Sequence, residues 1–355
     1  MYQPPETRRL QFTSRKSTER TVFGLLASPK TTGTDEVTGG RKTSAFHRTV
    51  RDLVTVKVLT RLDVESYIER AEELRGLPRK DVMRLHAGAV VASLFYEPST
   101  RTRLSFETAA LRIGAQVVSA ENALDNSSAK KGERLEDTLR IVGSYADVVV
   151  VRHHENDTLG RAASFCPVPV VSAGAGAGEH PTQALLDVYT LKREFGEVDD
   201  LSITILGDLR YGRTVHSLLT LLTQFSGVKV TVLPVPGLEL PTPLLQSLKI
   251  AGLNVQVVDS LGDALDGADA VYQTRIQTER LQGESALAAA SALRLGPDEL
   301  ELLPAHARIL HPLPRIGELD PALDSDPRAA YFRQAENGLF IRMAVLDSML
   351  EEGIS

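Results

Sequence analysis

The strongest constraint on the fold is a regular alternation of short apolar runs with amphipathic segments, which begins at about residue 53. Runs such as 89–95 and 147–151 are largely apolar, which is typical of parallel strands buried on both faces of a sheet. Between such runs, segments such as 64–74 and 133–144 carry apolar side chains at helical spacing. This alternation predicts βαβ units in which helices cover both faces of a parallel sheet.

The alternation falls into two sets that meet at a long predicted helix over residues 181–194. Strands are expected at 89–95, 116–118, 147–151 and 168–171 in the first set, and at 202–206, 228–233, 254–258, 270–272 and 308–310 in the second. The length of 355 residues fits about two domains. We predict two doubly wound parallel-sheet α/β domains joined by interdomain helices, with a first domain at 48–184, a second at 185–335 and a C-terminal helix at 336–355 that packs back on the first.

Composition narrows the class of protein. Apolar residues make up 42% of the chain, and no run of about 18 of them is long enough to cross a membrane. There are 40 basic and 46 acidic residues, so no basic surface points to nucleic acid. The single cysteine, Cys166, excludes an intrachain disulfide and a multi-cysteine metal site, and it fits a reducing compartment. We expect a soluble intracellular enzyme or binding protein that holds no metal.

The first 47 residues differ from the rest, because they are rich in Thr, Ser, Gly and Arg and show no sustained apolar periodicity. We expect a disordered extension on a cytoplasmic protein. The alternative is a transit peptide and a plastid location, which the many Arg, Ser and Thr residues favour. The acidic residues Glu6, Glu19, Asp35 and Glu36 weigh against it, since transit peptides are poor in acids.

One predicted strand-to-helix junction has the properties of an anion site. The strand ends before Pro98, and Ser99 and Thr100 then stand where a helix N-cap belongs. The first turn of a helix has unpaired N–H groups and the positive end of the dipole, and Arg101 and Arg103 add charge to that same turn. The residues alone indicate an anion site of unspecified type, with an ordinary cap and solvated arginines as the alternative.

The same segment, Ser-Thr-Arg-Thr-Arg at 99–103, resembles the carbamoyl-phosphate signature of the aspartate and ornithine transcarbamoylases. Three more motifs follow in order: His-Pro-Thr-Gln at 180–183, Gly-Asp-Leu-Arg-Tyr-Gly-Arg-Thr-Val-His-Ser at 207–217, and His-Pro-Leu-Pro-Arg at 311–315. The motifs at 180–183 and 311–315 resemble the aspartate branch, because the ornithine branch usually has Cys in place of Thr182 and reads His-Cys-Leu-Pro in the last motif. The resemblance covers about residues 48 to 352.

The resemblance implies transfer of a carbamoyl group. In that reaction the α-amino group of L-aspartate attacks the carbonyl carbon of carbamoyl phosphate, and phosphate leaves, which gives N-carbamoyl-L-aspartate for de novo pyrimidine synthesis. A site for this reaction holds a dianionic phosphate, polarises a carbonyl and grips two carboxylates. Positioning and electrostatic stabilisation therefore carry the rate, and neither a covalent intermediate nor a cofactor is implied.

Site residues are assigned by the same resemblance. Carbamoyl phosphate is expected to bind Ser99, Thr100, Arg101, Thr102, Arg152, His180, Gln183, Leu313 and Pro314, of which Arg101, Arg152 and His180 are catalytic. The family pattern has His180 on the carbonyl oxygen and Gln183 on the carbamoyl nitrogen, with backbone carbonyls of Leu313 and Pro314 accepting from the amino group. Aspartate is expected to bind Lys131, Arg213, Arg275 and Gln277. Two arginines for two carboxylates suit a dicarboxylic amino acid.

The resemblance also implies a homotrimer with shared active sites. Residues 126–133 resemble a mobile loop that reaches an adjacent subunit, which assigns Ser127 and Lys131 to a neighbour's site. Ala129 stands where some members have Gly, so the mobility of this loop could differ. Glu97 and Arg280 are expected to pair when the domains close. A regulatory or dihydroorotase partner stays open, and no nucleic-acid or membrane partner is expected.

Two rival functions remain. A related transferase could use another amino acid, which Arg275, Gln277 and the intact motif at 311–315 disfavour. An inactive scaffold subunit could bind only anions or a partner protein. Such a copy would be expected to have lost some site residues, and every residue named above is in place.

Overall fold

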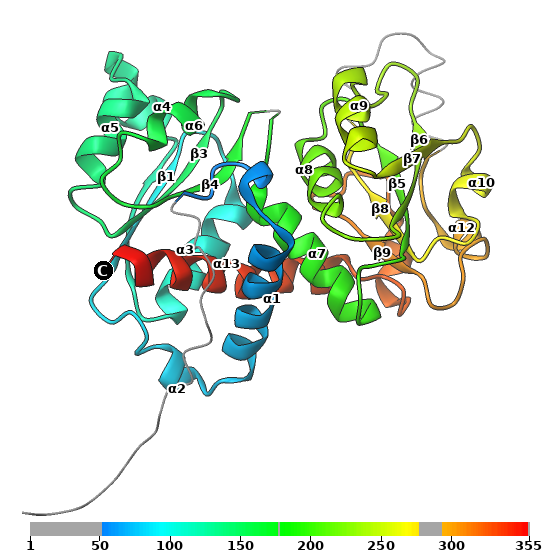
Figure 1. Cartoon of the computed structure of the whole chain (residues 1–355), viewed down its shortest axis with the longest axis horizontal. Coiled ribbons are helices and arrows are strands. Elements are labelled where there is room, and N and C mark those ends of the chain that lie inside the picture. Colours follow the sequence, from blue (N-terminus) through cyan, green and yellow to red (C-terminus); the bar gives the residue numbers. More distant parts are fainter. Residues whose placement is uncertain (1–51, 177, 277–292, 354–355) are drawn as a thin grey trace, which may run out of the picture. The chain divides into compact units, whose positions relative to one another are not determined.

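Two all-parallel sheets organise the protein in the computed structural model, which describes residues 52–176, 178–276 and 293–353 (Figure 1). The first sheet has the order β2-β1-β3-β4, with β1 (Val90–Phe95), β2 (Gln116–Glu121), β3 (Val148–His153) and β4 (Val170–Ala175). The second has the order β7-β6-β5-β8-β9, with β5 (Ser202–Gly207), β6 (Lys229–Pro234), β7 (Asn254–Val257), β8 (Ala270–Gln273) and β9 (Arg308–Leu310). Every pair of neighbouring strands is parallel, which confirms the predicted fold class.

Helices alternate with these strands along the chain. Those that precede the second sheet are η1 (Val56–Val58), α1 (Arg61–Gly76), α2 (Arg79–Val82), α3 (Thr100–Arg112), α4 (Ala123–Asn126), η2 (Ser128–Lys131), α5 (Leu135–Val142), α6 (Thr158–Ala163) and α7 (Pro181–Phe195). Those that follow are α8 (Arg213–Leu222), α9 (Thr242–Ile250), α10 (Leu261–Leu265), α12 (Pro297–Leu300), η4 (Pro321–Ser325) and α13 (Tyr331–Gly353). Within the described ranges, no helix is both long and apolar enough to cross a membrane.

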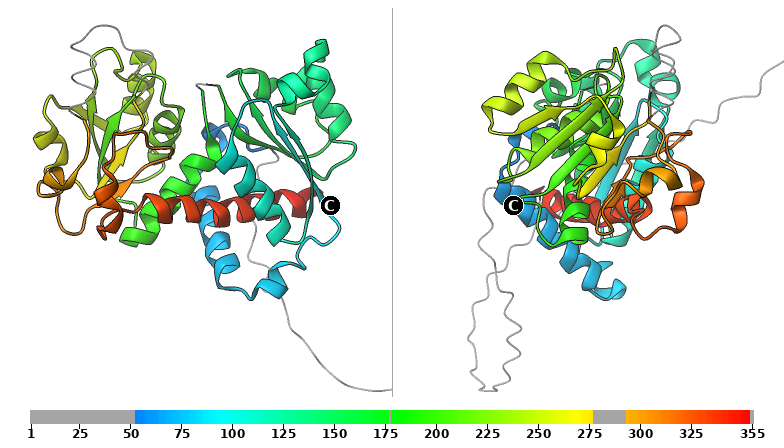
Figure 2. Two further views of the ribbon diagram at one scale, coloured as in Figure 1. Left: turned by 180° about the vertical axis from the view of Figure 1, so that it is seen from behind. Right: turned by 90° about the vertical axis from the view of Figure 1, so that its right-hand side faces the viewer.

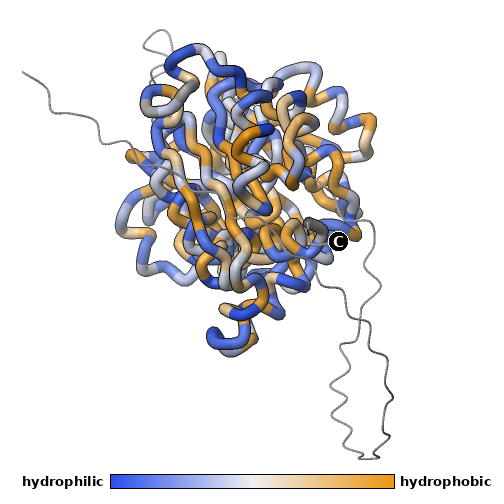
Figure 3. Tube along the Cα trace, turned by 90° about the vertical axis from the view of Figure 1, so that its left-hand side faces the viewer, coloured by the Kyte–Doolittle hydropathy of each residue, from blue (hydrophilic) through white to orange (hydrophobic). Residues whose placement is uncertain are grey.

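The register of the first sheet places the ends of β1 and β3, which lead into expected site residues, next to each other. Val91 lies opposite Val148 and Phe95 lies opposite Arg152, so β1 and β3 end side by side. The four valines at 148–151 are fully buried, and apolar residues follow the strands through the interior in Figure 3. Burial on both faces fixes the two strands firmly. Their carboxyl ends form the edge at which open parallel sheets bind ligands.

The C-terminal helix α13 packs against α1, α3 and α7 (Figures 1 and 2). Its buried Asp347 accepts hydrogen bonds from Arg70 Nε at 2.7 Å and His86 Nε2 at 2.8 Å. One apolar core joins residues of α7 and α13 to residues of both sheets, including Val148 and Ile205. The helices α7 and α13 therefore link the two sheets through a shared core.

Several elements differ in length from the sequence prediction. Strand β4 begins at Val170 and runs on to Ala175, whereas the prediction placed it at 168–171. Its second half is Ser-Ala-Gly-Ala, which lacks the β-branched side chains that mark a strand in sequence. Helix α13 begins at Tyr331, before the expected residue 336, because Tyr331 is fully buried in the apolar core of the second sheet.

Candidate active site

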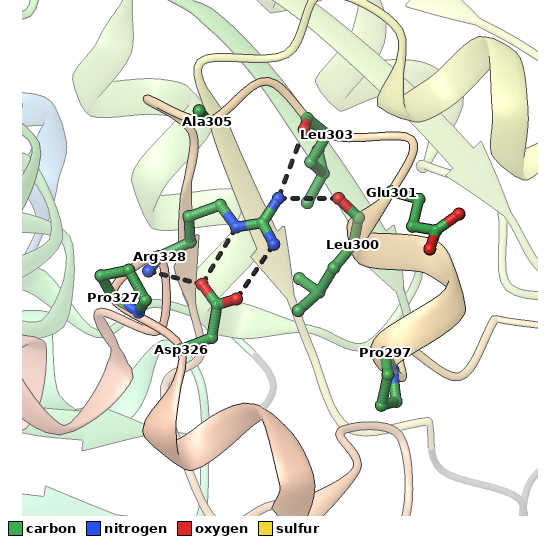
Figure 4. Close-up of a pocket in the computed structure, with 8 residues that line it drawn as sticks. All are labelled: Pro297, Leu300, Glu301, Leu303, Ala305, Asp326, Pro327 and Arg328. Carbon is green, nitrogen blue, oxygen red and sulfur yellow. Dashed lines mark hydrogen bonds and ion pairs between the residues drawn. The ribbon is translucent and has the colours of Figure 1, made fainter.

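The hollow shown in Figure 4 is not the functional site. It measures about 740 Å³ and is lined by Pro297, Leu300, Glu301, Leu303, Ala305, Asp326, Pro327 and Arg328. Arg328 is the one basic residue in this described lining, and it is already engaged by Asp326 and by the carbonyls of Leu300 and Leu303. The guanidinium ties residues 300–303 to residues 326–328 and is not available to an anionic ligand.

A second cavity, of about 800 Å³, lies where α3, α7 and α8 begin and where β3 ends. It is lined by all nine residues expected to bind carbamoyl phosphate, namely Ser99, Thr100, Arg101, Thr102, Arg152, His180, Gln183, Leu313 and Pro314, and by Arg213 and Arg275 of the expected aspartate set. An adjoining hollow of about 580 Å³ shares Arg152, Arg213 and Arg275 with it. Segments far apart in the sequence thus meet at one cavity.

The first turn of α3 faces this cavity. Ser99 is the N-cap residue, yet its hydroxyl makes no capping hydrogen bond, and the helical ladder starts with the Arg103 N–H on the Ser99 carbonyl. Arg101 has no hydrogen bond or ion pair within the described residues, and burial lowers its pKa. Arg103, in contrast, pairs with Glu107 at 3.3 Å and Glu121 at 2.9 Å, away from the cavity. Arg101 and the free N–H groups are therefore the donors that this turn offers to an anion.

Two arginines at the cavity share one carboxylate. Glu97 Oε2 lies 3.3 Å from Arg152 Nε and 3.8 Å from Arg213 Nη1. Burial and the nearby Arg213 charge lower the pKa of Arg152 to about 10, and burial lowers that of Arg213. Both groups stay charged at neutral pH. The packing is close, because a Cβ on Gly174 would lie 3.5 Å from each guanidinium. This concentration of positive charge favours a dianionic ligand.

His180 is the N-cap residue of α7 and is only 4% exposed. Its backbone N–H donates to Ser217 Oγ at 2.9 Å, and its ring Nδ1 has no partner in the described part of the chain. Burial, together with the charges of Arg213, Arg152 and Arg342, holds the pKa of His180 well below its usual value. The imidazole is therefore neutral, and a neutral ring can donate one N–H to a carbonyl oxygen.

The segment that contributes Leu313 and Pro314 is held by a buried histidine. Leu313 has a left-handed φ of +50°, which is strained for a residue with a branched side chain. Its N–H donates to His311 Nδ1 at 2.8 Å, so the proton of the neutral ring is on Nε2, which meets Glu318 Oε1 at 2.7 Å. The pair His311–Glu318 thus fixes the backbone beside the cavity.

Sequence reasoning missed the residues of α13 that line the cavity, of which Gln334 and Arg342 are polar and Ala335 is apolar. Arg342 is 4% exposed and donates to Ser105 Oγ at 2.9 Å, and burial lowers its pKa to about 10. It is the only basic residue among 338–350, a segment that is otherwise mostly apolar. A charge within such a buried helix is the signal that could have revealed it.

Within the described structure, Ser127 and Lys131 do not line this cavity, and Glu97 lines only the adjoining hollow. Ser127 and Lys131 belong to the segment of α4 and η2; Ser127 Oγ donates to the Ala123 carbonyl, and Lys131 is exposed. Gln277 and Arg280 lie outside the described residues. The expected pairing of Glu97 with Arg280 therefore stays a prediction. No group of His, Cys, Asp and Glu suited to a metal ion occurs within the described ranges.

Comparison with known proteins identifies relatives across most of the chain. Residues 51–193 match the family model described as aspartate/ornithine carbamoyltransferase, carbamoyl-P binding domain, and residues 199–349 match the model of the Asp/Orn binding domain. The chloroplastic aspartate carbamoyltransferase of Oryza sativa subsp. japonica is 45% identical over 285 residues, which cover 80% of this chain and 78% of that protein. The aspartate carbamoyltransferase catalytic subunit of Aliivibrio fischeri (strain MJ11) is 40% identical over 303 residues, which cover 85% of this chain and 97% of that protein.

Solved structures agree with the fold. Aspartate transcarbamoylase from Trypanosoma cruzi in complex with carbamoyl phosphate has a TM-score of 0.79 at 38% identity, covering 84% of this chain and 95% of that one. The catalytic subunit of M. jannaschii aspartate transcarbamoylase has a TM-score of 0.80 at 37% identity, and the match covers 85% of this chain and 99% of that one.

Proposed function

Because this chain belongs to the aspartate/ornithine carbamoyltransferase family, we propose that it transfers the carbamoyl group of carbamoyl phosphate to L-aspartate, which gives N-carbamoyl-L-aspartate and phosphate for pyrimidine biosynthesis. The observation that carries the proposal is the cavity that collects Arg101, Arg152 and His180 beside Arg213 and Arg275. Such a site can hold one phosphate and two carboxylates at once.

The phosphate is assigned to the first turn of α3. Ser99, Thr100 and Thr102 supply hydroxyl and backbone donors there, and Arg101 supplies a guanidinium with no competing partner in the described chain. Arg152 lies on the same cavity wall and can reach both phosphate and carbonyl oxygen. As the phosphate leaves, its growing negative charge is stabilised by Arg101 and Arg152.

The carbonyl oxygen of the donor is assigned to His180. A neutral imidazole polarises the carbonyl by donating one N–H, and the oxyanion that forms on attack strengthens that hydrogen bond. Gln183 and the backbone carbonyls of Leu313 and Pro314 hold the amino group of the donor. With both ends held, the aspartate amine meets the carbonyl carbon in a fixed geometry.

L-Aspartate is assigned to Arg213 and Arg275, one arginine for each carboxylate, with Gln277 and Lys131 as further ligands. Lys131 and Ser127 are absent from the cavity of their own chain and belong to a short segment with Lys131 exposed. That placement fits donation to a neighbouring subunit, so we assign the active state to a homotrimer with shared sites. A relative at 40% identity is named a catalytic subunit, which leaves room for a regulatory or dihydroorotase partner.

The domain division that we propose is 48–184 and 185–335, with residues 336–355 returning to the first domain. The packing of α13 against α1, α3 and α7 supports this division. Glu97 and Arg280 are assigned to closure of the two domains. Glu97 already reaches Arg213 of the second domain.

The cellular location has two candidates. The Oryza sativa relative is named chloroplastic and is 45% identical to this chain. The Aliivibrio fischeri relative is 40% identical, and its name states no location. The family match begins at residue 51, so residues 1–47 lie outside it. We propose a cytoplasmic protein, with a plastid as the alternative. The intact mass of the native protein distinguishes the two locations. Import into a plastid is accompanied by removal of the transit peptide, so a full-length mass would exclude plastid import.

The proposed reaction is tested with the purified chain, carbamoyl phosphate, and either L-aspartate or L-ornithine. We expect a carbamoylated product with aspartate alone. Turnover with ornithine in place of aspartate would reassign the substrate, and the absence of product with both would favour the scaffold function.

A further inference from the structure

A fully buried carboxylate lies directly behind Gln183. Asp187, one turn further along α7, accepts hydrogen bonds at Oδ1 from Gln183 Nε2 at 2.8 Å and from Gln334 Nε2 at 2.6 Å. Its Oδ2 accepts from the Tyr272 hydroxyl at 2.8 Å. The side chains of Asp187, Gln334 and Tyr272 are each at most 1% exposed. The carboxylate therefore joins α7 to β8 of the second sheet and to α13.

This network fixes which atom of Gln183 faces the cavity. Because Asp187 Oδ1 is an acceptor, the Gln183 amide must turn its NH₂ group toward Asp187. The carbonyl oxygen is then the polar atom that remains for the cavity, which Gln183 lines. Gln183 thus offers its carbonyl oxygen as an acceptor to whatever binds there.

Gln334 extends the same network to the other side of the cavity. Its Nε2 donates to Asp187, and its Oε1 accepts from the backbone N–H of His311 at 2.7 Å. The ring of His311 in turn accepts from the N–H of Leu313. The Gln183 side chain and the Leu313–Pro314 backbone, which are both assigned to the donor's amino group, are therefore aligned by one chain of buried hydrogen bonds.

The orientation does not depend on the charge of Asp187. Burial raises the pKa of Asp187 to about 7, against the opposing effect of its three hydrogen bonds. A proton on Oδ2 can be donated to the Tyr272 oxygen, while Oδ1 stays an acceptor for both amides. Both protonation states of Asp187 hold Gln183 in the same way.

We propose that Asp187 is a positioning residue that turns the carbonyl oxygen of Gln183 toward the cavity and, through Gln334, aligns it with the carbonyls of Leu313 and Pro314. The site consequently selects acyl phosphates that carry N–H groups beside the carbonyl. This inference rests on the proposed function, because it takes these acceptors as the ligands of the carbamoyl amino group.

Acetyl phosphate is the matched probe, since it has a methyl group where carbamoyl phosphate has an amino group. A methyl group leaves the aligned acceptors unpaired, and sites built to bond an N–H group strongly reject analogues without it. We define the discrimination ratio as the inhibition constant of acetyl phosphate, competitive against carbamoyl phosphate, divided by the KM of carbamoyl phosphate. A merely structural residue would change stability and leave this ratio unchanged.

Three variants test the proposal on the full chain. Asp187→Leu removes the acceptor that orients Gln183, and we expect the discrimination ratio to fall at least about tenfold. Asp187→Asn keeps an amide oxygen that can accept from Gln183, so its ratio should stay within about threefold of the unmodified protein. Asn337→Ala is the control, because Asn337 Nδ2 donates to Thr190 Oγ1 at 3.0 Å across the same pair of helices, one turn further on. It should lower the melting temperature and keep the ratio.

An unchanged ratio in Asp187→Leu, or an equal fall in Asn337→Ala, would overturn the proposal. If Asp187→Leu fails to fold, Gln334→Met replaces it. Gln183 keeps its bond to Asp187 and only the link to His311 is lost, so a fall in the ratio that is smaller than for Asp187→Leu is expected. An unchanged ratio in Gln334→Met would then contradict the proposal. Absence of carbamoyl-aspartate from the unmodified protein would refute the proposed function and this inference together, whereas an active protein with an unresponsive ratio would refute the inference alone.

Discussion

Glu97 and Arg213 approach each other from two different sheets, with Oε2 of the glutamate 3.8 Å from Nη1 of the arginine. Glu97 follows β1 of the first sheet, and Arg213 opens α8 after β5 of the second. The same carboxylate oxygen lies 3.3 Å from Arg152. One acidic side chain therefore compensates two guanidinium groups that would otherwise repel each other across the cavity.

Replacing Glu97→Gln should impair the use of aspartate more than the use of carbamoyl phosphate. The variant leaves Arg152 and Arg213 without their shared counter-charge. Arg213 keeps its hydrogen bond to the Gly176 carbonyl but is held less firmly against the repulsion of Arg152. We expect the KM for aspartate to rise about tenfold, as for the loss of one partner of a half-buried charge pair. The KM for carbamoyl phosphate should stay within about threefold, because positive charge at its site is retained. Steady-state kinetics check this, and unchanged KM values for both substrates would contradict it.

Arg101→Ala is expected to lower kcat by at least about 10²-fold, because the guanidinium stabilises the charge of the departing phosphate. Arg103→Ala is the matched control in the same turn, since Arg103 pairs with Glu107 and Glu121 and does not line the cavity. Its kcat should remain within about threefold. Equal losses in the two variants would show that the helix turn, and not the Arg101 charge, matters.

The imidazole of His180 should stay neutral where an exposed histidine gains a proton. Its pKa is lowered by burial and by three arginines, so the folded protein disfavours the protonated ring. Stability linked to His180 is therefore present above the ordinary pKa of about 6.5 and is lost as pH falls below it. The ring signals can be followed in proton–nitrogen correlation spectra and assigned by their loss in His180→Asn. They should show no titration midpoint between about pH 6 and 7, the range around the ordinary histidine pKa. A midpoint at or above 6.5 would contradict the neutral donor.

Asp347→Asn should destabilise the protein strongly at neutral pH. Although burial opposes it, hydrogen bonds and charges from His86 and Arg70 hold the pKa of Asp347 below its usual value. Breaking such a buried pair costs about 3–5 kcal/mol. A carboxylate with a lowered pKa stabilises the fold above the unfolded pKa of about 3.9, and that stability is lost as pH falls through the lower folded value. In urea unfolding, the difference from the unmodified protein should therefore shrink below about pH 4; a constant difference would contradict the ion pair.

Shared active sites predict recovery of activity when two inactive variants are mixed. Arg101→Ala disables the cavity of its own chain, and Lys131→Ala removes a group that serves a neighbour. Trimers that contain both chains include a cavity with all of its residues intact. Activity should rise after the two purified variants are unfolded and refolded together, but not after each is refolded alone. No recovery in mixtures shown to contain mixed trimers would contradict the shared site.

The sequence predicted best the parts of the site that are continuous in the chain. The segments at 99–103 and 180–183 combine a strand end, a helix start and polar residues within a few positions, and the structure places both at the cavity. The two-sheet architecture was also predictable from local sequence. The four consecutive valines at 148–151 indicate a buried strand by themselves, and all four are buried in the structure.

Contacts between distant segments were not predictable in this way. Gln334 and Asp187 are separated by 147 positions, and their hydrogen bond exists only because α13 packs on α7. Arg342 reaches Ser105 across 237 positions, and Gly338 leaves room for it, since a Cβ there would lie 2.6 Å from its Nη1. Neither residue stands in a recognisable local motif. Apart from the charge of Arg342 within an apolar helix, their part in the site follows from tertiary packing.

The most direct test of the account follows the labelled carbon of ¹³C-carbamoyl phosphate by NMR, with L-aspartate and either the unmodified protein or Arg101→Ala. We expect the label to appear in N-carbamoyl-L-aspartate with the unmodified protein, and at least about 10² times more slowly with the variant. Label that reaches no amino acid, or that reaches aspartate equally fast with both proteins, would contradict carbamoyl transfer at this cavity.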